Sequence, residues 1–161
     1  MITNYLSPLE FQIAIKRIPN VEFFTQKISL PAVNVSPVER SGPMNKVFQT
    51  PDKMTYDELS LSFIVDEKMT NYLEIFNWLK GISAPESFDQ YRRTNESDDG
   101  LYSDISVMIL NSNKNANIEF TFYNCFPTSL SGVELDTTNT DVIYPESSVT
   151  FRYDYYEIGI K

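Results

Sequence analysis

Three pairs of adjacent carboxylates are the residues of this sequence whose type and spacing could do chemistry. They are Asp57-Glu58, Asp66-Glu67 and Asp98-Asp99. Two carboxyl groups that flank a glycosidic bond can act as general acid and general base. Nothing in the sequence singles out one pair, and acidic pairs at loop edges are usually solvated. A small acid/base hydrolase is therefore an open but disfavoured interpretation.

Other sites that could support catalysis lack the residues they need. The segment 95–104 has oxygen ligands but not the spacing of a twelve-residue calcium loop. The chain has no histidine, which removes the commonest general base and metal ligand, and it has no GxGxxG or GxxxxGK[ST] phosphate loop. The single cysteine, Cys125, ends an apolar stretch, and we expect a buried, inert thiol there. We predict no catalytic residue, no cofactor and no metal, and therefore no enzyme.

Arg92 and Arg93 follow Tyr91, and an arginine–aromatic cluster can bind nucleic acid. The net charge of −9 argues against attraction of nucleic acid. Residues 1–50 carry five basic and three acidic side chains, whereas residues 51–161 carry eight and nineteen. Such asymmetry could pair opposite faces of neighbouring copies, although a merely solvated acidic surface would look the same. We interpret Arg92 and Arg93 as candidates for salt bridges to a neighbouring subunit.

Alternating apolar residues predict most of the secondary structure as strand. The chain of 161 residues suits one domain, 1–161, and we expect no signal peptide and no membrane-spanning segment. Short turns between strands predict antiparallel pairing, with residues 11–15 and 21–30 as a hairpin around Pro19-Asn20. The expected architecture is a β-sandwich or small barrel with one flanking helix. The predicted strands are 11–15, 21–30, 58–65, 105–109, 118–122 and 148–158, with a short piece at 46–50 and a polar hairpin turn at 111–115.

One amphipathic helix is predicted at about residues 67–80. Asp66 is a plausible N-cap, Gly81 a plausible C-terminal stop, and Trp78 a core or interface aromatic. The apolar stripe expected to face the core consists of Met69, Tyr72, Leu73, Phe76 and Leu79.

Residues 36–55 are predicted to be a long excursion with little regular structure, because Pro37, Gly42, Pro43 and Pro51 interrupt it. A loop of this length is usually functional or ordered by a partner, although a surface hairpin without a role is the alternative. The candidate inter-subunit contacts are Gly42, Pro43, Met44, Asn45, Lys46, Val47, Phe48, Gln49, Arg92 and Arg93.

The order of these elements resembles the tail tube protein family of contractile-tailed phages. The most specific parts are a Phe-Pro-Thr-Ser-Leu turn at 126–130 and a Tyr-Asp-Tyr strand at 153–155. The acidic segment 86–104 is the least similar part. The full set of matching stretches is 11–15 through Phe23-Phe24 to a Leu-Pro turn at 30–31, residues 56–67, the helix through 76–79, and residues 125–131 with 148–156.

The resemblance implies a structural subunit of the inner tail tube. Family members form homo-hexameric rings, which stack into a tube inside a tail sheath, with strands of adjacent subunits continuing around an inner barrel. DNA passes through the lumen without specific binding, and baseplate and tail terminator proteins bound the tube. The chain would then be a virion tail component assembled in the host cytoplasm.

Two alternatives remain open at this point. Within the same family, the chain could form the ring that initiates or terminates the tube. From another class, a carbohydrate-binding β-sandwich could use Tyr153, Tyr155 and Tyr156 to stack on sugars.

Overall fold

Antiparallel strands make up most of the chain, as the sequence predicts. The computed structural model describes residues 6, 9–51, 53–83, 92, 100–138 and 143–160. Every strand pair among them is antiparallel. The elements are β1 (Phe11–Ile15), α1 (Pro19–Phe24), β2 (Thr25–Ser29), β3 (Val33–Val35), β4 (Val38–Ser41), β5 (Lys46–Gln49), β6 (Met54–Tyr56), β7 (Leu59–Ile64), α2 (Thr70–Ser83), β8 (Ser103–Leu110), β9 (Ala116–Leu130), β10 (Glu146–Arg152) and β11 (Tyr155–Ile160).

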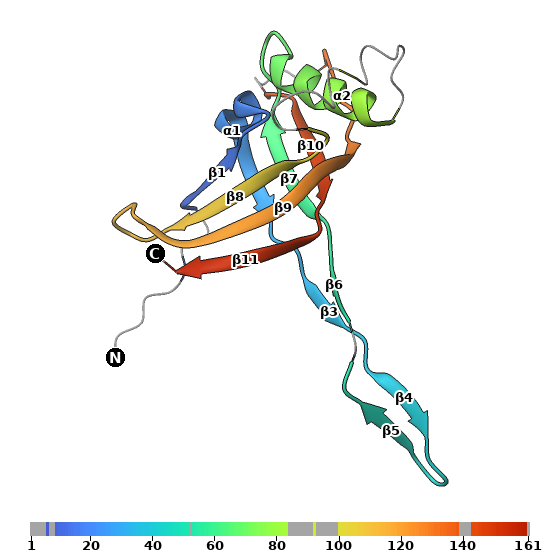
Figure 1. Cartoon of the computed structure of the whole chain (residues 1–161). Coiled ribbons are helices and arrows are strands. Elements are labelled where there is room, and N and C mark those ends of the chain that lie inside the picture. Colours follow the sequence, from blue (N-terminus) through green and yellow to red (C-terminus); the bar gives the residue numbers. More distant parts are fainter. Residues whose placement is uncertain are drawn as a thin grey trace.

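Strand β9 joins two half-sheets that run in different directions (Figure 1). Its first part pairs with β8 and β11, and together with β1 these strands form what we call sheet A, in the order β1–β8–β9–β11. Its last part pairs with β10, and β7 and β2 complete sheet B. At the bend Asn124 has φ 55°, a conformation that asparagine tolerates. The Asn124 side chain donates to Asp154 Oδ2 (2.7 Å) and so fastens β9 to the next corner of the chain.

The core lies between the two half-sheets, and alternation along the strands explains its composition. On β7 the residues Leu59, Leu61 and Phe63 are buried, and Phe151 of β10 and Phe122 of β9 meet them from other strands. The predicted helix adds Trp78, whose ring centroid lies 5.9 Å from that of Phe151. The Trp78 Nε1–H also donates to the Leu101 carbonyl (3.1 Å). Trp78 is thus a core residue, as predicted.

The predicted hairpin of 11–15 with 21–30 is wrong. Pro19 occupies the first turn of helix α1, where proline is well tolerated because that N–H needs no helical partner. The strand begins only at Thr25 and pairs with β7, whereas β1 pairs with β8. Val21, predicted as a strand residue, is instead the buried residue of α1.

Helix α2 is rotated and shifted relative to the prediction. It begins at Thr70. The side chain that hydrogen-bonds to the backbone before the helix is that of Asn71, whose Oδ1 accepts from the Asp66 N–H, and not that of Asp66. Asn71 is fully buried, which fixes the rotation of the helix. The helix continues through Gly81, the predicted stop, to Ser83. No helix among the residues described is long and apolar enough to cross a membrane. The buried face consists of Asn71, Ile75, Trp78 and Gly81, whereas Met69, Leu73 and Phe76 of the predicted core stripe are exposed.

Two features near the C-terminus differ from the prediction, and both lie close to the corner between the half-sheets. The predicted strand 148–158 divides into β10 and β11, because Tyr153 and Asp154 turn that corner. Tyr155 therefore leaves the buried face that Val149, Phe151 and Tyr153 share. The predicted turn at 126–130 is the last part of β9, and its Pro127 lies beside a register shift, where a strand tolerates a missing N–H.

Candidate assembly surfaces

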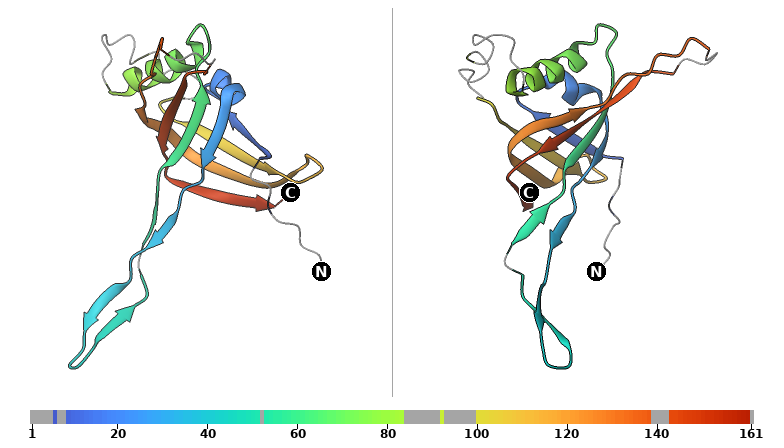
Figure 2. Two further views of the ribbon diagram at one scale, coloured as in Figure 1. Left: turned by 180° about the vertical axis from the view of Figure 1, so that it is seen from behind. Right: turned by 90° about the vertical axis from the view of Figure 1, so that its right-hand side faces the viewer.

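Residues 31–51 and 53–57 form a long β-hairpin arm that projects from the body (Figures 1 and 2). The predicted irregular excursion is therefore regular: β3 pairs with β6, and β4 pairs with β5 further out. The predicted strand at 46–50 is confirmed as β5. Every residue of β3, β4 and β5 is exposed. An isolated two-stranded hairpin is marginally stable in water, so this arm has little packing of its own to hold it.

The arm tip, residues 38–49, contains eight of the ten predicted contact residues. Gly42, Pro43, Met44 and Asn45 form the turn, and Lys46, Val47, Phe48 and Gln49 form β5. A Cβ at Gly42 would lie 2.5 Å from the Asn45 carbonyl oxygen, so this turn requires glycine. Met44 is 95% exposed and Phe48 62% exposed. Large apolar side chains gathered on a projecting element are typical of an interaction surface.

Of the remaining two predicted contact residues, the structure describes only Arg92. Arg92 is exposed. Arg93 lies outside the described residues, as do residues 95–99 of the segment 95–104, which include Asp98 and Asp99. The inter-subunit contacts of Arg92 and Arg93 therefore stay a prediction.

The outer face of sheet A is polar. Along each strand the residues that alternate with the buried ones point away from the core. Of the ten outer positions below, Glu119 and Glu157 are charged and none is basic. Tyr123 donates its hydroxyl to Glu157 Oε2 (3.2 Å), which raises the pKa of Tyr123. The positions are Gln12, Ala14, Ser106, Met108, Glu119, Thr121, Tyr123, Tyr155, Glu157 and Gly159.

Sheet A ends in two open edges. Among the described residues, β1 pairs only with β8, and β11 pairs only with β9. The inner face is also left uncovered near β11, where Ile158 is 57% exposed and Ile160 is 86% exposed. An open edge next to exposed apolar side chains is a template for pairing with another chain. The alternation of residues in β8, β9 and β11 is the signal in the sequence that points to this surface.

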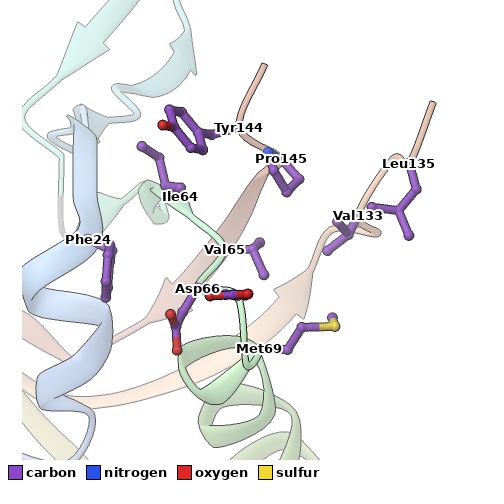
Figure 3. A pocket seen from close by; sticks show the side chains of 10 residues that line it. Phe24, Ile64, Val65, Asp66, Met69, Val133, Leu135, Tyr144 and Pro145 are labelled. Carbon is purple, nitrogen blue, oxygen red and sulfur yellow. The ribbon is translucent and has the colours of Figure 1, made fainter. Parts of the chain in front are cut away.

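An open apolar pocket of about 820 Å³ is lined by residues of α1, of the segment before α2, of the segment after β9 and of the segment before β10 (Figure 3). Helices α1 and α2 lie at the opposite end of the molecule from the arm tip (Figure 1). In Figure 3, Phe24 of α1 stands on one side of the space and Val133 and Leu135, which follow β9, on the other. Met69, before α2, and Tyr144, before β10, also line it. No local pattern in the sequence predicts this pocket, because four separate segments build it.

The residues considered for chemistry are not gathered into a site. No group of three or more possible metal ligands occurs in the part of the chain that the structure describes. Cys125 is buried, as predicted, and burial raises the pKa of its thiol to about 12. Of the three tyrosines considered for sugar stacking, Tyr153 is buried and donates its hydroxyl to the Asp57 carbonyl (2.8 Å), and Tyr156 packs on Phe122. Tyr155 is exposed, but its ring stacks on Tyr123.

Solved structures show the same fold over nearly the whole chain. A chain of the anti-feeding prophage baseplate has 17% identity and a TM-score of 0.70, with 98% of this chain and 97% of that chain covered. A chain of the sheath-tube complex of an extracellular contractile injection system, PVC, has 18% identity and a TM-score of 0.69, with 98% and 93% covered. A chain of the anti-feeding prophage tube terminating cap has 16% identity and a TM-score of 0.72, with 100% and 95% covered. At these identities the likeness shows the fold alone.

The family of this chain is shown by a match to a family model, whereas the solved structures show only the fold. A search of curated protein sequences found no match. The model described as "Phage tail tube protein" matches residues 4–159. This confirms the resemblance drawn from the sequence, and the chain belongs to the phage tail tube protein family, whose members are structural components of tails and not enzymes.

Proposed function

We propose that the chain is the main subunit of the inner tube of a contractile tail. Residues 1–161 act as one tail-tube-like domain, and six copies close into a ring. The observation that carries the proposal is sheet A with its two open edges. If β11 of one copy pairs with β1 of the next, the edges disappear and the sheets continue around a barrel. The neighbouring copy would also cover Ile158 and Ile160, which are exposed in the single chain.

The outer face of sheet A would then line the lumen. Its charged positions, Glu119 and Glu157, are acidic. A negative wall repels the phosphate backbone, so DNA can slide through without binding to the tube. The acidic side chains of this face would therefore serve the passage of the genome during ejection.

The related structures support a proposal for the partners. One similar chain comes from a sheath-tube complex, one from a six-fold symmetrised baseplate and one from a tube terminating cap. We propose a tail sheath around the tube, with a baseplate and a terminator at its ends. Such a tail is part of the virion and is assembled in the host cytoplasm.

Electron microscopy of the purified chain tests the proposal. We expect rings with six-fold symmetry that stack into tubes as the concentration rises. A strictly monomeric protein at high concentration would contradict it. The likeness to a chain of a terminating cap makes an end ring of the tube the second candidate, and discrete rings that never stack would favour it.

A further inference from the structure

We infer that Asn124 fixes the angle between sheet A and sheet B, and through this angle the curvature with which copies close into a ring. The ring is part of the proposed function, and the inference adds to it the residue that sets its geometry. Strand β9 runs through both sheets, so a bend within β9 orients one sheet against the other (Figure 1). Asn124 lies at this bend.

A β-bulge surrounds Asn124. The register between β8 and β9 shifts at Asp104, which lies opposite two residues of β9, Tyr123 and Asn124, in place of one. Such a bulge bends its strand and increases the local twist. Phe122 and Cys125 are both buried, although regular alternation would put residues three apart on opposite faces. The bulge therefore keeps the inward side of β9 directed at the core before and after the bend.

Three hydrogen bonds hold the bend. The Asn124 N–H donates to Asp104 Oδ1 (3.1 Å), and Asn124 Nδ2 donates to Asp154 Oδ2 (2.7 Å). The Asp154 N–H donates to the Tyr123 carbonyl (3.1 Å). Asp154 lies between β10 of sheet B and β11 of sheet A, where the chain passes between the sheets a second time. The two passages are thus tied together through Asn124, partly by bonds to a carboxylate, which are among the stronger hydrogen bonds.

Asparagine meets two requirements at this position. Its φ of 55° is accessible to glycine, asparagine and aspartate and is unfavourable for most other residues. Glycine has no side chain that could donate to Asp154. Aspartate cannot donate when ionised, and its charge would lie beside the carboxylates of Asp104 and Asp154.

The angle of the bend matters for a ring because sheet A carries both open edges, β1 and β11. The position of sheet A against the rest of the body decides the direction in which β11 of one copy meets β1 of the next. A ring closes only if every copy turns its sheet by the same share of the circle. A loose bend lets this share vary, so rings of other sizes and open arcs become accessible.

Electron microscopy of three variants tests the inference. Asn124→Ala loses both the favoured φ and the bond to Asp154, whereas Asn124→Gly loses only the bond. We expect both variants to give rings of mixed size or open arcs where the parent gives six-fold rings, and circular dichroism should show them folded. The matched control Asn113→Ala makes the same exchange at an exposed position in the turn between β8 and β9, and it should keep six-fold rings.

A second measurement needs no assembly. Spin labels on Lys27→Cys of β2 in sheet B and Asn117→Cys of β9 in sheet A occupy exposed positions, and the native Cys125 is buried. Pulsed electron paramagnetic resonance of the unassembled chain should show a shifted and broader distance distribution in Asn124→Gly than in the parent.

The outcomes separate this inference from the proposed function. Unchanged distances in Asn124→Gly and Asn124→Ala would overturn the inference, and so would six-fold rings from both variants, while the tube stays as a proposal. A parent chain that forms no ring would overturn the proposed function and the control of curvature, whereas the spin-label distances still decide whether Asn124 holds the two sheets at one angle.

Discussion

Replacing Asn71 by alanine should weaken the attachment of α2 to sheet B. The side chain is fully buried and makes three hydrogen bonds. Its Oδ1 accepts from the N–H groups of Asp66 (3.2 Å) and Tyr72 (2.8 Å), and its Nδ2 donates to the Ile64 carbonyl (2.7 Å). Each polar group left without a partner costs about 1–3 kcal/mol, so we expect Asn71→Ala to lower the free energy of unfolding by about 3 kcal/mol.

This loss can be measured by thermal or urea unfolding of the unassembled chain. The only tryptophan, Trp78, is buried on the same helix, so its fluorescence reports on α2. For a chain of this size about 3 kcal/mol corresponds to a fall in Tm of roughly 6–12 °C. The control Asn77→Ala makes the same exchange at an exposed position of α2 and should change stability by less than about 0.5 kcal/mol.

A further variant separates the two roles of the amide. Asn71→Asp keeps an oxygen that can accept from both N–H groups, but its carboxylate cannot donate to the Ile64 carbonyl. Protonation restores a donor, so its defect should shrink as the pH falls from 7 to 5. Equal stabilities of Asn71→Ala and Asn77→Ala would refute the view that the buried amide holds the helix in place.

Four further predictions concern the rotation of α2, the buried thiol, the arm and the outer face of sheet A. Ile75→Ala should cost about 2–5 kcal/mol in chemical denaturation, whereas Leu73→Ala on the exposed face should cost far less; the reverse order would contradict the observed helix rotation. Cys125 should resist Ellman's reagent at pH 8 until the chain unfolds. Because burial raises its pKa from 9.0 to about 12, its contribution to stability is complete below pH 9 and is lost as the pH rises towards 12, so urea midpoints should fall above pH 9. Deleting residues 42–50 should block polymerisation but leave the circular dichroism spectrum folded, and unimpaired tubes would rule out a role for the arm. Glu157→Lys should make assembled tubes retain DNA in a gel-shift assay at low salt, and an unchanged mobility would argue against this face as the lumen.

Sequence patterns predicted the interior of the strands well. Strict alternation in 58–65 gave β7, and the alternating apolar residues of 105–109 and 118–122 gave β8 and part of β9. A strand with one buried face must alternate, so the pattern is local and readable. The family resemblance rested on the order of such stretches and was confirmed by the match over residues 4–159.

Errors arose where two patterns compete locally and a distant contact decides. The sequence 67–80 contains two overlapping apolar stripes, and a stripe of Met69, Leu73 and Phe76 looks better than one that includes Asn71. The hydrogen bonds of Asn71 to the end of β7 select the other face. In the same way, β2 pairs with β7 and not with β1, and nothing in 21–30 alone identifies that partner.

The sequence by itself determined that the chain is a β-rich structural protein without the residues for common catalytic sites, and it marked residues 42–49 as an exposed segment suited to contacts. Only the tertiary structure decided that this segment is the tip of a hairpin arm, that β1 and β11 are the open edges of one sheet, and that four separate segments build an apolar pocket. The physical reason is range. Alternation and turn chemistry act between neighbours along the chain, whereas edges and pockets are made by segments distant in sequence, such as Phe24, Met69, Leu135 and Tyr144.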